Sequence, residues 1–215
     1  MPYAVVNDFQ FLHTQPEDTR RAGLIEAVKV ALVRDGEFFD WMEANVTKLH
    51  ALDEAALEEA VERSALQHAR HIALGGDPFE LGSSRPLDYG HWAAHKLEQL
   101  TDFELGHGEA VSVGVALDTL YAAKVGILDP ADAERVLQVI EKLELPIWHE
   151  ALELRDAHGR RRVFNGLEEF REHLGGELTV LLLSEVGVGI DVHEIDEAVW
   201  GKCAEELKAR GLSVV

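Results

Sequence analysis

The sequence has only one cysteine, Cys203, among its 215 residues. A single cysteine cannot form a disulfide within the chain, and such a composition is typical of reducing compartments. The first residues, MPYAVVNDF, lack the basic start and the apolar run of a secretory signal. No apolar run approaches the about 20 residues that are needed to cross a bilayer. We therefore expect a cytoplasmic protein without a membrane segment.

Basic residues are scarce as well. Lys and Arg together number 20 against 40 Asp and Glu, which gives a net charge of −20. A surface of this sign repels nucleic-acid phosphates and anionic lipids, so we expect neither nucleic acid nor membrane as a partner. A small anionic substrate is still allowed, because a few basic side chains in a cleft can reverse the local field.

Phosphate-binding and nucleophile motifs are missing. The sequence contains neither the GxGxxG of a dinucleotide-binding turn nor a P-loop. It also lacks the GxSxG elbow of serine hydrolases. This chain therefore does not itself supply a nucleotide-binding fold of a known kind.

What the sequence does have is helical periodicity. Apolar residues recur at helical spacing between start and stop signals, while two late segments are β-like. We predict a mainly α, bundle-like domain with a small element of two or three strands, and we find no linker that would divide residues 1–215. The expected helices are 16–34, 37–49, 53–74, 111–127, 129–145, 166–174 and 196–210, and the expected strands are 3–6, 177–184 and 188–195.

One stretch, residues 85–108, gathers histidines. His91 and His95 lie one turn apart if this stretch is helical, and His107 opens the next apolar segment. Neutral imidazoles that converge with a carboxylate form a catalytic zinc-type site with one open position. The same spacing also occurs in many helices that bind no metal, so the histidines alone leave both interpretations open.

Charged pairs on other predicted helices have two interpretations. Glu26 and Lys29 are three residues apart, so they share one helix face. They could form an exposed ion pair worth a few tenths of a kcal/mol, or a metal ligand beside a substrate-binding base. The run Arg160-Arg161-Arg162 is interpreted as a solvated loop.

Three ordered runs resemble a known family. They are GLIEAVKVALVRDGEFF (23–39), RPLDYGHWAAHKLE (85–98) and HGEAVSVGVAL (107–117). Together they resemble the C-terminal domain of 3-dehydroquinate synthase and of the wider sugar phosphate cyclases, over almost the whole chain. The resemblance implies a helical, metal-bearing domain over residues 1–215, without the family's N-terminal NAD-binding domain.

The resemblance also implies residue roles, carried over by position. The metal, zinc or cobalt, would be bound by one carboxylate and two imidazoles. Two further side chains would be catalytic, and four would hold the substrate. The metal ligands would be Glu26, His91 and His107, the catalytic residues Lys29 and His95, and the substrate-binding residues Arg70, Arg85, Asp88 and Arg171.

The implied reaction is a cyclisation by a carbon–oxygen lyase. NAD would oxidise an alcohol of a sugar phosphate, phosphate would be eliminated, the ketone would be reduced, and an aldol step would close a carbocycle. Basic side chains would hold the phosphate. The expected partners are the sugar phosphate and an NAD-binding domain in trans, without which the chemistry would be incomplete. A homo-oligomer is compatible with the sequence.

Several positions depart from the dehydroquinate synthase pattern. Asp88 stands where that pattern has Asn, Ser84 where it has Arg, and Arg70 and Arg171 where it has Lys. Arginine and lysine differ in reach and geometry, so these changes affect substrate recognition. The departures favour a heptulose phosphate without a carboxylate, as in the valiolone-type cyclases. The alternatives are a non-catalytic binding or scaffold domain, and a metal-dependent polyol dehydrogenase, whose histidines are spaced differently.

Overall fold

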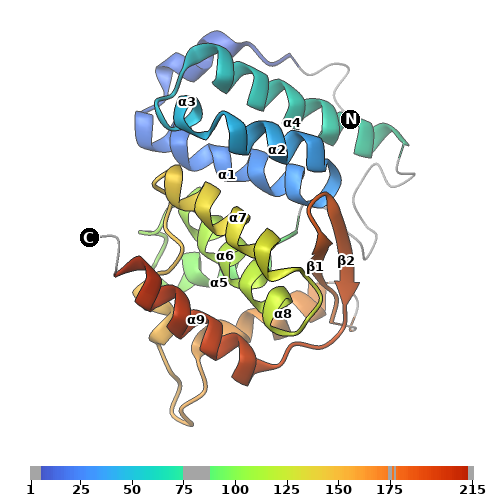
Figure 1. Ribbon diagram of the computed structural model, residues 1–215. Coiled ribbons are helices and arrows are strands. Elements are labelled where there is room, and N and C mark those ends of the chain that lie inside the picture. Colours follow the sequence, from blue (N-terminus) through green and yellow to red (C-terminus); the bar gives the residue numbers. More distant parts are fainter. Residues whose placement is uncertain (1–5, 75–87, 174–175, 177, 213–215) are drawn as a thin grey trace.

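The computed structural model (Figure 1) describes residues 6–74, 88–173, 176 and 178–212. The described part of the chain is mainly helical with one antiparallel hairpin, as predicted. The helices are α1 Glu17–Arg34, α2 Gly36–Ala44, α3 Val46–His50, α4 Glu54–Leu74, α5 His91–Leu100, α6 His107–Lys124, α7 Pro130–Lys142, α8 Asn165–His173 and α9 Glu197–Gly211. Three short 3-10 turns, η1 Phe9–Thr14, η2 Glu150–Glu153 and η3 Arg162–Phe164, and the strands β1 Val180–Glu185 and β2 Val188–Val192 complete the described part.

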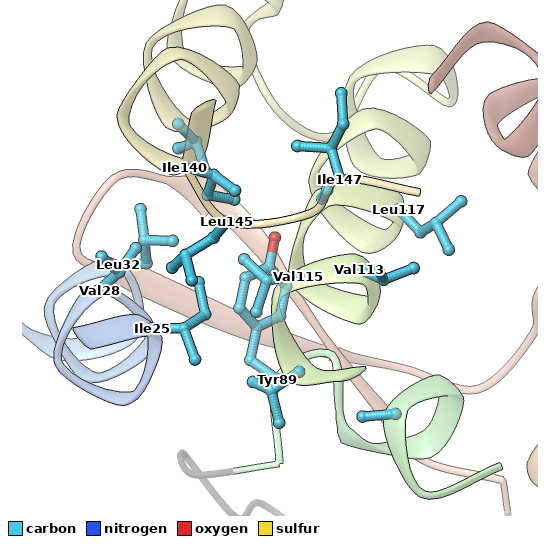
Figure 2. Packing of buried hydrophobic residues seen from close by; sticks show 14 of the residues in the cluster. Ile25, Val28, Leu32, Tyr89, Val113, Val115, Leu117, Ile140, Leu145 and Ile147 are labelled. Carbon is cyan, nitrogen blue, oxygen red and sulfur yellow. The ribbon is translucent and has the colours of Figure 1, made fainter. Parts of the chain in front are cut away.

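Helix α6 is the centre of the fold. It contacts α1, α5, α7, α9 and β1, and its residues from 110 to 122 are all buried. A helix that is apolar on every side is stable only when other elements cover it on every side. In Figure 2, Val115 of this helix lies on the side that faces α1, whereas the buried side chains of Val113 and Leu117 point to the other side of the helix. The predicted central helix is confirmed, although it begins at His107 rather than at residue 111.

The expected helix 37–49 is wrong as a single element. The structure has two helices there, α2 and α3, separated at Asn45. Asn45 has φ −107° and ψ 11°, and its side-chain amide donates a hydrogen bond to the Trp41 carbonyl at 2.9 Å. A side chain that takes a backbone carbonyl in this way competes with the helical hydrogen bonds, which explains the break.

The hairpin packs beside α1. Strand β1 pairs with β2 in the register Val180↔Val192, and the turn between them has Gly187 at φ +92°. The Gly187 N–H donates to the Leu32 carbonyl at 2.7 Å, which ties the turn to the end of α1. The strands expected at 177–184 and 188–195 are thus confirmed as a pair with shorter bounds. The strand expected at 3–6 lies almost entirely outside the described residues.

The basic run after η2 does not form a solvated loop. Arg161 is only 6% exposed, and its guanidinium donates to the Leu152 carbonyl at 2.8 Å. Arg160 forms an ion pair with Glu197 at 2.6 Å. The long aliphatic stem of arginine allows such burial when the guanidinium group has hydrogen-bond acceptors.

Cys203 is buried in α9. None of the helices in the described part is long and apolar enough to cross a membrane.

Two helices approach each other at a pair of glycines. Gly90, with φ +75°, precedes α5, and Gly114 lies in the middle of α6. A Cβ atom on Gly114 would lie 2.0 Å from the Gly90 carbonyl oxygen, which no rotamer could relieve. Only glycine lets these two backbones meet, so this contact fixes the position of the first residues of α5 on α6.

We expect Gly114→Ala to destabilise the protein by at least about 3 kcal/mol, because backbone atoms rather than a flexible side chain oppose the new methyl group. The matched control is Gly23→Ala in α1, where a Cβ would meet nothing within 4 Å. This control should gain about 0.5–1 kcal/mol, since alanine is the better helix former. Urea unfolding of the three proteins checks both signs, and equal stability of the two variants would contradict the contact.

Candidate metal centre

Three helices bring one carboxylate and two imidazoles together. Glu26 lies in α1, whereas His91 and His107 are the first residues of α5 and α6. One donor atom from each lies within 4.8 Å of the other two. Oε1 of Glu26 is 3.6 Å from Nε2 of His107 and 3.9 Å from Nε2 of His91. Ligand atoms about 2.0–2.1 Å from a tetrahedral zinc lie about 3.3 Å apart, so small movements would suffice to close the set.

The two rings are oriented through their other nitrogens. Nδ1 of His91 is 3.1 Å from the Tyr89 carbonyl oxygen, and Nδ1 of His107 is 3.2 Å from Oε1 of Glu98. A ring that donates its Nδ1 proton to such an acceptor presents the lone pair of Nε2 to the site. Metal-binding histidines generally have an outer contact of this kind.

One oxygen of the Glu26 carboxylate is available to a metal ion. Its Oε1 atom is buried and accepts no hydrogen bond from the described residues. An unpaired buried oxygen is costly in free energy unless a cation or another donor satisfies it. The donor set, the ring orientation and this unpaired oxygen together fit a divalent cation.

A buried lysine sets the charges of the centre. Lys29 is 2% exposed, and its ammonium lies 2.6 Å from Oε2 of Glu26 and 3.4 Å from Nε2 of His91. Burial, and then the Lys29 charge, lower the pKa of His91 to about 4. Burial alone would raise the pKa of Glu26, but Lys29 and the two histidines lower it. Near neutral pH His91 is therefore uncharged and Glu26 ionised, which are the protonation states that a metal requires.

The interpretation of Glu26 and Lys29 as an exposed ion pair is therefore wrong, because Lys29 is buried. His95, one turn after His91 on α5, is exposed at the edge of the centre. Its ring centroid lies 5.4 Å from that of His91 and 6.1 Å from that of His107. The structure thus brings the three predicted ligands and both predicted catalytic residues into one cluster.

The predicted substrate-binding residues are more scattered. Arg70 is exposed towards the end of α4, and Arg171 is exposed on α8 in an ion pair with Glu168 at 2.9 Å. Within the described residues no ion pair joins either arginine to Glu26. Asp88 is half-buried, and its carbonyl accepts from the His91 N–H at 3.0 Å. Arg85 lies outside the described residues.

A cavity of about 440 Å³ lies next to the centre, between α1, α4 and η1. Glu26 and Lys29 belong to its wall, which is otherwise mainly apolar and includes Leu24, Leu57 and Val61. Polar residues also line the cavity, namely Gln15, Thr19, Arg20, Ser64 and His68.

The sequence did not reveal the buried hydrogen bonds that hold the residues next to His91 in place. The Trp92 indole N–H donates to the buried Asp118 carboxylate at 3.1–3.2 Å, and the hydroxyls of Tyr89 and Thr119 share a hydrogen bond of 2.6 Å. These contacts hold Tyr89 and Trp92, the residues on either side of Gly90 and His91, against α6. The available signal was the lone acid at position 118 in a long apolar run, because an unpaired carboxylate is rarely buried.

Comparison with known proteins agrees with this architecture. Residues 23–160 match the model of the 3-dehydroquinate synthase C-terminal family, and the chain belongs to this family. It is 33% identical over 213 residues to 3-dehydroquinate synthase of Aliivibrio fischeri, and 35% identical over 206 residues to that of Halorhodospira halophila. These matches cover 97% and 95% of this chain but only 56% and 54% of the relatives, so the chain spans about half of their length.

Solved structures show the same fold. A 2-epi-5-epi-valiolone synthase from Streptomyces hygroscopicus, with NAD⁺ and Zn²⁺ bound, superposes with a TM-score of 0.83 at 27% identity. That match covers 94% of this chain and 55% of the synthase. A 2-deoxy-scyllo-inosose synthase, complexed with carbaglucose-6-phosphate, NAD⁺ and Co²⁺, has a TM-score of 0.68 at 19% identity over 93% of this chain and 55% of the synthase. The second likeness supports the fold alone.

The buried acid behind His91 gives a pH prediction. Burial raises the pKa of Asp118 to about 7 from its ordinary 3.8, against the opposing hydrogen bonds from Trp92 and Gly90. The folded state therefore holds a proton that the unfolded state has released, and stability falls as pH rises from about 4 to about 7. We expect wild type to lose about 2–4 kcal/mol relative to Asp118→Asn over this range.

Urea unfolding of both proteins at a series of pH values measures this difference. Asp196→Asn is the matched control, because that carboxylate is an exposed helix cap, accepting from the backbone N–H of Ala198. The stability difference between wild type and the control should not decline over the same pH interval. A pH-independent difference for Asp118→Asn would show that this carboxyl is not buried in its protonated form.

Proposed function

We propose that this chain is the metal- and substrate-binding part of an NAD-dependent sugar phosphate cyclase, a carbon–oxygen lyase that closes a carbocycle with elimination of phosphate. The main support for this proposal is that Oε1 of Glu26 lies 3.9 Å from Nε2 of His91 and 3.6 Å from Nε2 of His107. Family membership over residues 23–160 supports it. Residues 1–215 would form the C-terminal domain, and NAD would be bound mainly by another domain, in cis or in trans.

Glu26, His91 and His107 would hold Zn²⁺ or Co²⁺, since carboxylate and imidazole accept both ions. When bound, the ion would polarise substrate hydroxyls as a Lewis acid. Lys29 would donate a hydrogen bond to a substrate oxygen from its buried position beside Glu26. His95, at the exposed edge of the centre, would exchange protons with a bound substrate.

The substrate class follows from the positions that depart from the dehydroquinate synthase pattern. We propose a heptulose phosphate without a carboxylate, because Ser84 and Asp88 replace an arginine and an amide. The likeness to a valiolone synthase at 27% identity supports this choice. Arg70, Arg85 and Arg171 are the candidates to hold the phosphate, and Arg171 would exchange its Glu168 partner for it.

A binding or scaffold domain without catalysis is the alternative function. It would be under no requirement to keep Lys29 buried next to a carboxylate and an imidazole. A buried charged group is expensive, and groups of this kind concentrate at functional sites. The Lys29 arrangement therefore favours the enzyme, although the chain spans only about half of its relatives.

Metal content tests the centre directly. We expect about one zinc or cobalt per chain by elemental analysis after dialysis against excess metal, and a loss of affinity of at least 100-fold in His91→Ala. His158→Ala removes an exposed histidine from a turn and should leave the metal in place. Lys29→Met should bind metal at least as tightly as wild type, because a neighbouring positive charge is removed. A folded, metal-supplemented wild type without metal would refute the ligand assignment.

Phosphate release tests the reaction. The chain would be mixed with the NAD-binding domain of a relative, NAD, cobalt and a heptulose phosphate, with or without a carboxylate. We expect release from the compound without a carboxylate and at least 100-fold less from Lys29→Met, which keeps its metal. Full metal occupancy with no release from either compound would favour the scaffold function.

A further inference from the structure

The His107 ring lies between two carboxylates. Its Nε2 is 3.6 Å from Oε1 of Glu26, and its Nδ1 is 3.2 Å from Oε1 of Glu98. The second carboxylate belongs to another group, His95, Glu98 and His107, in which one donor atom from each residue lies within 4.8 Å of the other two. His95 and Glu98 are three residues apart on α5, so they share one face of that helix. The described residues thus contain two clusters of metal-ligand type with His107 in common.

We propose that His95, Glu98 and His107 form a second divalent-metal site, and that the proton position on His107 decides which of the two sites is complete. The ligand class is a first-row cation that accepts imidazole and carboxylate, such as Zn²⁺ or Co²⁺. This site shares only His107 with the centre of Glu26, His91 and His107. The proposal concerns metal binding only, so it does not depend on cyclase activity.

A neutral imidazole carries one proton, on either nitrogen. With the proton on Nδ1, His107 donates to Glu98, and the Nε2 lone pair completes the first site. With the proton on Nε2, the N–H would point towards Oε1 of Glu26, a buried oxygen 3.6 Å away that has no hydrogen-bond partner, and the Nδ1 lone pair would complete the second site. The proton leaves one nitrogen and is taken up by the other, so the charge of the ring is unchanged.

The two sites therefore exclude each other at His107. Occupancy of both at once would require the ring to lose its last proton. Exposure distinguishes the imidazoles that the sites do not share: the His91 side chain of the first site is 10% exposed, whereas His95 of the second site is exposed. The second site faces solvent, where water can fill the remaining coordination positions. In the first site the His91 ring and the Oε1 atom of Glu26 are both buried, so the first site should bind more tightly.

Cobalt titrations of the full chain at pH 7.5, followed by the visible absorbance of bound Co²⁺, test the proposal. We expect wild type to bind one cobalt, and His95→Asn to change that affinity less than threefold. Glu26→Gln keeps an acceptor oxygen for the Nε2 proton but weakens the first site. This variant should still bind one cobalt, 10- to 1,000-fold more weakly and with an altered spectrum.

The decisive protein is the double variant Glu26→Gln, His95→Asn. We expect it to lose at least a further 30-fold in affinity relative to Glu26→Gln, while the matched control Glu26→Gln, His158→Asn loses none. Circular dichroism and urea unfolding establish that each variant is folded. Nitrogen-15 spectra of zinc-loaded protein should show His107 coordinated through Nε2 in wild type and through Nδ1 in Glu26→Gln.

Three results would overturn the proposal. One is a folded Glu26→Gln that binds no cobalt at millimolar concentration. Another is cobalt in Glu26→Gln whose affinity does not change with His95→Asn. The third is a wild type that binds two cobalt ions at once through His107, because the proton switch forbids double occupancy.

Discussion

The contact between two backbones, Gly90 before α5 and Gly114 within α6, is the constraint on which the candidate centre depends. It places the start of α5, and with it His91, on the central helix. A second close approach has the same character: a Cβ on Gly108 would lie 2.5 Å from the Ala22 carbonyl oxygen of α1. The three helices that carry the proposed ligands therefore meet through backbone atoms, so the spacing of the ligands does not depend on flexible side chains.

The free-energy penalty of burying an ionisable group is offset in different ways at Lys29 and at Asp118. Lys29 has the ionised carboxylate of Glu26 beside it, so its charge is compensated within the centre. Asp118 has only hydrogen bonds, and its pKa rises to about 7. The first group is placed where it can act on a ligand, whereas the second supports the segment next to His91. One of these two buried groups thus serves the centre, and the other supports the segment that carries His91.

Much of the fold could be predicted from the sequence because its causes are local. The apolar periodicity of α1, the continuous apolar run of α6 and the leucine-rich run that begins at Val180 indicate burial directly. The break at Asn45 could not be predicted in this way, since residues on either side continue the helical pattern. The burial of Arg161 depends on the Leu152 carbonyl, which only the tertiary fold supplies. Within the site, the histidine spacing indicated the imidazoles, but Glu26 came from the family resemblance, and the contact of Glu98 with His107 required the packing of α5 on α6.

The three proposed ligands lie far apart along the chain, at positions 26, 91 and 107, and on separate helices. The chain has a single cysteine and cannot cross-link itself through a disulfide. An ion held at this centre would act as such a cross-link, closing one long loop and one short loop of the polypeptide and restricting the unfolded ensemble only as long as the metal stays bound. The free energy of folding and the supply of metal would then be linked, so this domain would be most resistant to unfolding when it is loaded.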